Sequence, residues 1–126
     1  MNLDDVVAEV AGSCRATKAR IEARRLTRAY DKALADQGLR STEYAVLVAV
    51  GRLGNGRMAE IADLLEMDIS TLSRSVTSLA AKGWLVVEIL GHRTRRLSLT
   101  DSGVAKVLAA YPAWLKAQAR QEADRS

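Results

Sequence analysis

The only histidine of the chain and three arginines stand within five consecutive residues: His92, Arg93, Arg95 and Arg96. A guanidinium group stays charged at physiological pH and can bind two phosphate oxygens at once. The cluster could therefore contact a polyanion such as a nucleic acid. A charged group of this kind can equally be the solvated tip of a hairpin, so the neighbouring segments have to distinguish the two interpretations.

A segment rich in hydroxyl side chains precedes the cluster. Between residues 69 and 82, Leu72, Val76 and Leu79 recur at helical spacing, and most other positions up to residue 78 are short and polar. A helix face of this kind is more often plain soluble surface, but serine and threonine are mediocre helix formers, so this many of them in one helix is unfavourable unless they serve a purpose. Hydroxyl groups can meet phosphate oxygens or base edges, and an arginine can bond a guanine in two places. The candidate DNA contacts are Ser70, Thr71, Ser73, Arg74 and Thr77 in the helix, and Arg93 and Arg95 in the hairpin.

Apolar periodicity predicts the elements that would hold these side chains. Helices are expected at residues 3–10, 14–36, 41–52, 58–65 and 69–82, and a final helix from Thr100 or Asp101. The expected caps are Ser13, Ser41 or Thr42, and Asp68. Residues 85–90 and 96–99 are expected to form two strands around a Gly91-His92 turn. Pro112 is expected to kink or restart the final helix, and Tyr44, Leu47 and Val48 to be buried.

The order of these elements is informative. Two helices joined by a tight turn at residues 66–68 and followed by a hairpin form a winged helix-turn-helix, whose second helix lies in the major groove of DNA. A basic hairpin beside such a helix is placed to reach the DNA backbone or the minor groove. We therefore expect Arg93 to contact the groove, Arg95 and Arg96 to meet phosphate or lie on the strand surface, and His92 to be solvated. The predicted fold class is mainly α with a small β-hairpin wing (α+β).

Several segments together resemble the MarR family of winged-helix transcription regulators. The resemblance is carried by residues 68–83 and 99–103, and also by Leu26-Thr-Arg-Ala-Tyr30, Gly38-Leu39, Met58-Ala-Glu-Ile-Ala62 and Tyr111-Pro-Ala-Trp114. It covers nearly the whole chain from about Cys14. Two features depart from the family pattern: Gly91 stands where the family usually has an aspartate before the wing arginine, and the wing is about two residues shorter.

The resemblance implies a sequence-specific, DNA-binding transcriptional regulator, a repressor, that acts as a homodimer on a pseudo-palindromic site. It implies dimerisation helices at residues 1–37 and 101–126, and a DNA-binding module at 41–100, within one domain of 126 residues. The apolar stripes at 3–10 and 104–115 fit this dimer independently. Half-sites would lie about 34–36 Å apart. The resemblance also implies release by a small-molecule effector, bound near Tyr30, Arg24 or Arg28.

Composition narrows the functional classes. The net charge is +4, and the positive charge is concentrated in two regions. Residues 12–40 contain eight basic and three acidic residues, and residues 68–100 contain five basic and two acidic residues. This distribution suits double-stranded DNA as a partner. With one histidine, one cysteine and none of the common catalytic motifs, we expect no enzyme, no metal site and no cofactor. An acidic N-terminus and the absence of a long apolar run predict a cytoplasmic protein without a membrane partner.

Two alternatives keep this fold. Cys14, at the expected start of the second helix beside Arg15 and near Lys18, could be a thiol that senses peroxides, as in some family members, or a small buried residue at the dimer interface. The chain could also be a winged-helix protein-interaction module that does not bind DNA. Salt distinguishes this last alternative, because binding through phosphate contacts weakens steeply as salt rises.

Overall fold

The computed structural model describes residues 1–125 as seven helices and one hairpin. The elements in chain order are α1 (Leu3–Ser13), α2 (Arg15–Leu34), the 3₁₀-helix η1 (Ala35–Gln37), α3 (Ser41–Leu53), α4 (Met58–Leu65), α5 (Ile69–Ala81), β1 (Leu85–Leu90), β2 (Thr94–Leu99) and α6 (Asp101–Asp124). The predicted mainly helical fold with a small hairpin wing is confirmed. Within residues 1–125, no helix is both long and apolar enough to span a membrane.

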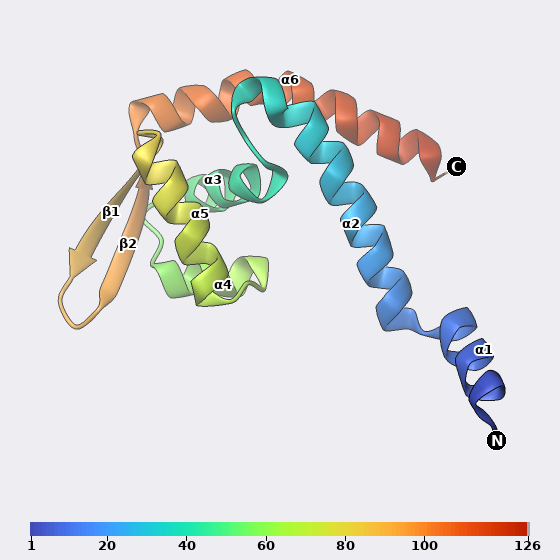
Figure 1. Cartoon of the computed structure of the whole chain (residues 1–126). Helices are drawn as coiled ribbons and strands as arrows, with labels where there is room; N and C mark the ends of the chain where they lie inside the picture. Colours follow the sequence, from blue (N-terminus) through green and yellow to red (C-terminus); the bar gives the residue numbers. More distant parts are fainter. Residues whose placement is uncertain (126) are drawn as a thin grey trace.

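The helices fall into two groups (Figure 1). Helices α3, α4 and α5 and the hairpin form a compact module, whereas α2 and α6 lie against each other and α1 extends away from them. The core of the module is aliphatic, as expected of a chain without phenylalanine. Its fully buried side chains include Leu47, Ile61, Leu72, Leu79 and Leu97, which come from α3, α4, α5 and β2. Helix α5 is therefore held in place by side chains from three other elements of the module.

Two expected helix ends differ from the structure, and a third, at Asp68, is confirmed. The break between the first two helices falls at Cys14, because Ser13 stays inside α1, where its hydroxyl donates to the Glu9 carbonyl. The third helix is capped at Arg40 rather than at Ser41 or Thr42, because the Ser41 N–H is taken by Asp31 Oδ1 at 2.7 Å. Asp68 is the N-cap of α5, as predicted, but its side chain makes no capping hydrogen bond.

Three further expectations need correction. Pro112 lies inside α6 but does not restart it, since the helix runs unbroken from Asp101 to Asp124. Tyr44 and Leu47 are buried as predicted, but Val48 is 46% exposed, because it borders a cavity between α2, α3 and α6. The second strand begins at Thr94 instead of Arg96, because its pairing with β1 extends to the Leu90–Thr94 pair.

The wing base is joined to α6 by a close backbone approach. Thr100 caps α6 by accepting the Gly103 N–H at 2.9 Å, and its own hydroxyl donates to the Gly83 carbonyl at 2.6 Å. A Cβ atom at Gly103 would lie 2.1 Å from the Trp84 carbonyl oxygen, so only glycine fits there. The ammonium groups of Lys82 and Lys106 both lie over the Trp84 ring, 5.3 and 5.0 Å from its centroid.

Two apolar surfaces remain uncovered in the single chain. Every residue of α1 is exposed, including Leu3, Val6, Val7 and Val10. On α6, one face carries four large apolar side chains that are 46–68% exposed: Val104, Leu108, Tyr111 and Leu115. Exposed apolar faces of this extent are characteristic of interaction surfaces.

Candidate nucleic-acid interface

Helix α5 turns its apolar side to the core and its polar side outward. Leu72, Val76 and Leu79 are buried, as their spacing predicted. Of the five helical candidates, Ser70, Arg74 and Thr77 are exposed, and Thr71 and Ser73 are half-buried. The helix begins after a tight turn in which Glu66 adopts a left-handed conformation (φ 51°) and Met67 N–H returns to the Ala62 carbonyl at 2.9 Å. This turn sets the angle at which α5 leaves α4.

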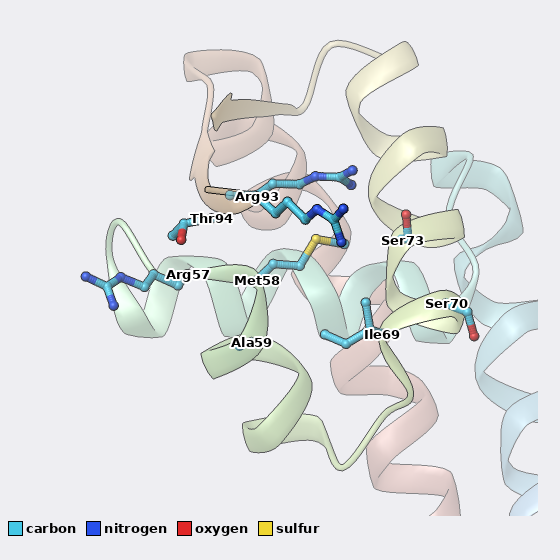
Figure 2. Close-up of a pocket in the computed structure, with 9 residues that line it drawn as sticks. Arg57, Met58, Ala59, Ile69, Ser70, Ser73, Arg93 and Thr94 are labelled. Carbon is cyan, nitrogen blue, oxygen red and sulfur yellow. The ribbon is translucent and has the colours of Figure 1, made fainter. Parts of the chain in front are cut away.

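A cavity of about 580 Å³ lies between the start of α4, the first turns of α5 and the wing. Its lining includes four of the seven predicted contacts, Ser70, Ser73, Arg93 and Arg95. Figure 2 shows the Arg93 side chain extending from the wing toward α5, on the side where Ser73 lies. The structure thus brings the basic hairpin and the hydroxyl-bearing helix to one concave surface. Thr71, Arg74 and Thr77 do not line this cavity.

Local hydrogen bonds orient some of the polar side chains of α5. The Thr77 hydroxyl donates to the Ser73 carbonyl at 2.9 Å, which leaves its oxygen free to accept. The Arg74 guanidinium lies 3.5 Å from Thr71 Oγ1, at the outer limit of a hydrogen bond, so it can leave this contact at little cost. Ser70 is exposed on the first turn of the helix. Ser70 and Arg74 are therefore well placed to meet an external partner.

Ser78 does not belong to this outward face, although it lies in the same hydroxyl-rich stretch of the sequence. Its hydroxyl donates to Glu43 Oε2 at 2.9 Å. Glu43 is buried on α3 and also accepts from the Arg40 N–H at 3.0 Å and from Lys82 Nζ at 3.2 Å. Burial by itself would raise the pKa of Glu43, but these hydrogen bonds and the Lys82 charge together lower it below its ordinary value. This carboxylate ties the C-terminal end of α5 to α3.

The wing tip has an unusual backbone. Gly91, His92 and Arg93 all have positive φ angles, of 42°, 44° and 67°. The left-handed region disfavours residues with a Cβ atom, so two of these three positions are strained. This left-handed backbone closes the loop in three residues between the paired Leu90 and Thr94, and Thr94 N–H donates to the Gly91 carbonyl at 3.0 Å. His92 is exposed, as expected.

The base of the wing has a third strand-like edge that sequence reasoning missed. Arg57 forms an antiparallel bridge with Arg96, and Leu97 N–H donates to the Gly56 carbonyl at 2.9 Å. The Arg57 side chain borders the same cavity and, in Figure 2, points away from α5. Arg96 is half-buried beside this bridge instead of lying freely on the strand surface. In the sequence, Arg57 is a single basic residue directly before the apolar pattern of residues 58–65, and nothing else there indicated a role for it.

The predicted effector residues separate in space. Tyr30 borders the cavity between α2, α3 and α6, which has a volume of about 400 Å³. Arg24 and Arg28 are exposed on α2 and do not line this cavity. The cavity contains aromatic residues that sequence reasoning did not connect, namely Tyr44, Tyr111 and Trp114.

Cys14 lies at the junction of α1 and α2, partly exposed in the single chain. The Thr17 hydroxyl lies 3.3 Å from its Sγ atom. Hydrogen bonds from the Thr17 side chain and backbone, aided by the Arg20 charge, lower the pKa of the Cys14 thiol below its ordinary value. This cysteine is thus more readily ionised than an ordinary one.

Comparison with known proteins places this arrangement in a family. A family model described as MarR family matches residues 37–96, which span the helix-turn-helix and most of the wing. The chain is similar to the Mycobacterium tuberculosis transcriptional regulator MosR in complex with DNA: the TM-score is 0.80 and the identity 30%, over 88% of this chain and 82% of that chain. A second crystal structure of MosR matches with a TM-score of 0.79 and 30% identity, over 89% and 82%.

A transcriptional regulator of the MarR family from Rhodococcus sp. RHA1 shares the fold, with a TM-score of 0.71 and 22% identity, over 96% of this chain and 81% of that chain. The comparison with curated proteins gives no match. Because the family model covers the helix-turn-helix and a 30% identical regulator is matched over four-fifths of its length, the chain belongs to the MarR family.

Proposed function

We propose that this chain is a sequence-specific, DNA-binding transcriptional regulator that represses its target genes as a homodimer. The observation that carries the proposal is the concave surface on which Ser70 and Ser73 of α5 face Arg93 and Arg95 of the wing. The similarity to MosR, whose structure was determined in complex with DNA, supports it. The net charge of +4 and the basic residues of 68–100 fit a polyanionic partner.

In this proposal α5 enters the major groove. Ser70, Thr71, Ser73, Arg74 and Thr77 provide its contacts, and the exposed Arg74 reads a base pair through a two-pronged bond to guanine. Arg93 reaches the adjacent minor groove from the wing tip, and Arg95 binds a backbone phosphate. The left-handed tip backbone, rather than a neighbouring aspartate, directs Arg93, because Gly91 occupies the position where the family usually has that aspartate.

Dimerisation would cover the two apolar surfaces left open in the single chain. The α1 face and the α6 face at 104–115 belong to the segments that we assign to the dimer, residues 1–37 and 101–126. Residues 41–100 then form one DNA-binding module per protomer. Two recognition helices related by a two-fold axis would read a pseudo-palindrome whose half-sites lie about 34–36 Å apart.

Selection of bound sequences from a random duplex pool at physiological salt tests the proposal. The expected result is an enriched site with two inverted halves, spaced by about one helical turn. If no duplex sequence is enriched, or if duplex binding does not weaken as salt rises, the result would instead support a protein-interaction module. A single unrepeated half-site would contradict the homodimer.

Small-molecule release is part of the proposal. The cavity bordered by Tyr30 lies where α2 and α6 meet α3, between the proposed dimerisation helices and the DNA-binding module. A ligand there would change how α3, and with it α5, is held relative to the partner protomer. Because Arg24 and Arg28 lie outside it, the ligand would be bound by the aromatic lining instead.

A second candidate function is peroxide sensing by Cys14, and the lowered pKa of its thiol favours it. The thiolate would attack one oxygen of a hydroperoxide. The sulfur would be oxidised to sulfenic acid, the O–O bond would break, and the other oxygen would leave as alcohol or water. Cys14 lies at the hinge between α1 and α2, so its oxidation would act on the proposed dimer interface.

A further inference from the structure

Within α5, all of whose residues the structure describes, Ile69 is the only large apolar side chain that is left exposed. The other three, Leu72, Val76 and Leu79, are buried in the core, whereas Ile69 is 53% exposed. A single exposed isoleucine is ordinary on a protein surface. Its place in the fold therefore has to show whether it serves a purpose.

Ile69 is the first residue of α5 and borders the cavity between α4, α5 and the wing. Figure 2 shows its side chain extending from the start of α5 toward the side where Met58 lies. Met58 and the exposed Ala59 of α4 line the same cavity, whose other lining residues are serines, arginines and a threonine. The concave surface thus has an apolar part at the start of α5, beside the polar and basic part already described.

The chemistry of this apolar part does not suit a phosphate, because it offers neither a charge nor a hydrogen bond. On the base edges of the major groove, the apolar feature is the 5-methyl group of thymine, which apolar side chains can contact. Isoleucine is β-branched and has few rotamers, so it loses little conformational freedom in such a contact. The short side chains of Ser70 and Ser73, which line the same cavity, let the backbone of α5 come close to the bases.

We propose that Ile69 contacts the 5-methyl group of one thymine in each half-site and so makes the methyl group itself part of the recognised sequence. The first residues of a recognition helix are the ones that meet base edges, which is where Ile69 stands. Because 5-methylcytosine carries the same group, Ile69 also favours that base over cytosine at this position. The inference rests on the proposed function, since it names a chemical feature of the DNA that the regulator selects.

Binding of the full chain to synthetic duplexes that carry the selected site tests this contact. In each duplex, uracil replaces thymine at one position of both half-sites, which removes the methyl group and keeps the pairing with adenine. At one position the replacement should weaken binding about fourfold for each half-site, because burying one methyl group is worth about 0.8 kcal/mol and tenfold in affinity is about 1.4 kcal/mol. In Ile69→Ala this effect should vanish. Val86→Ala, at a 52% exposed position on β1 outside the cavity, should keep it.

A second pair of duplexes, with cytosine or 5-methylcytosine at the sensitive position, isolates the methyl group. The parent chain should bind the methylated duplex about fourfold more tightly for each half-site, and Ile69→Ala should bind the two equally. Both tests compare two duplexes with the same variant, so a change in its folded fraction cancels.

A selected site without any uracil-sensitive thymine would overturn the inference. A uracil effect that persists in Ile69→Ala would show that another side chain meets the methyl group and would overturn the role of Ile69. If no duplex is selected at all, the proposed function fails and the inference falls with it, which is a different result from a selected duplex that is indifferent to the methyl group.

Discussion

The Ser78 hydroxyl of α5 donates to Glu43 Oε2 of α3 across 2.9 Å, although the two residues are 35 positions apart in the chain. The same carboxylate pairs with Lys82, which follows α5 directly. A single buried acid thus fixes the far end of the proposed recognition helix, while its first turns face the wing. The orientation of α5 relative to α3 is therefore set by this interaction together with the apolar core.

The Glu43 interaction predicts a specific acid sensitivity. Because the pKa of Glu43 is lowered in the folded chain, its carboxylate contributes stability that is complete above the ordinary value near 4.5 and is lost as the pH falls through the folded-state pKa. In Glu43→Gln this component disappears, so the free energy of unfolding should fall less between neutral pH and pH values below 4. Urea unfolding at both pH values measures it, with the exposed-site variant Glu22→Gln as control. An identical fall in Glu43→Gln and the parent chain would contradict the assignment.

The contact between α6 and the wing base predicts that Gly103→Ala is strongly destabilising. The new Cβ atom would lie 2.1 Å from the Trp84 carbonyl oxygen, and this oxygen also accepts the Thr100 N–H, so neither backbone segment can move freely. We expect a loss of about 2 kcal/mol or more in the free energy of unfolding. Gly12→Ala is the matched control, because nothing lies within 4 Å of the Cβ position there. Thermal unfolding at equal midpoints for both variants would refute the close approach.

The fold class, and the face of each helix that is buried, could be predicted from the sequence because both follow from the local periodicity of apolar residues. Leu72, Val76 and Leu79 share one face of any α-helix, whatever surrounds it, and they are buried. The inward turn of Ser78 could not be predicted in this way. Several similar hydroxyl residues occupy α5, and the choice among them is made by Glu43 on a different helix.

In the proposed binding surface too, some features could be predicted from the local sequence, whereas others depend on contacts between distant segments. The proximity of α5 and the wing followed from the order of the elements, and Ser70, Ser73, Arg93 and Arg95 do line one cavity. Arg57 joins them only because its backbone pairs with Arg96, 39 residues later, and no local pattern encodes that register. The family resemblance implied a ligand near Tyr30, Arg24 or Arg28, but the side of α2 that faces the cavity depends on the packing of α2 against α6, and of these three only Tyr30 lies on that side.

The contact between Thr17 and Cys14 predicts how the thiol ionises. Removing the hydroxyl in Thr17→Val should raise the pKa of the Cys14 thiol toward its ordinary value, because the largest stabilising hydrogen bond to the thiolate is lost. The pH dependence of alkylation by iodoacetamide, at the single cysteine of the chain, reports this shift. Thr17→Ser keeps the hydroxyl and should behave as the parent chain. If Thr17→Val and the parent chain alkylate with the same pH profile, the peroxide-sensing candidate loses its support.

Arg74→Ala tests the proposed base contact. The side chain is exposed on α5 and is held only by a 3.5 Å contact with Thr71, so its removal should leave the fold intact. Affinity for the selected duplex should fall by about 1–3 kcal/mol, and affinity for a random duplex should fall much less. Competition titrations with both duplexes measure the ratio. An equal loss for both would mean that Arg74 meets phosphate and reads no base.

Arg93→Ala tests the wing at its strained tip. Arg93 has a left-handed backbone (φ 67°) and borders the cavity beside α5, where we propose that it meets the duplex. If this guanidinium displaces one counterion from DNA, its loss should weaken the selected and random duplexes alike and reduce the slope of log K against log salt by about one. The control, Arg24→Ala, removes an exposed charge on α2 that does not line this cavity and should leave the slope unchanged. Equal slopes for Arg93→Ala and the parent chain would show that the wing tip does not reach the DNA backbone.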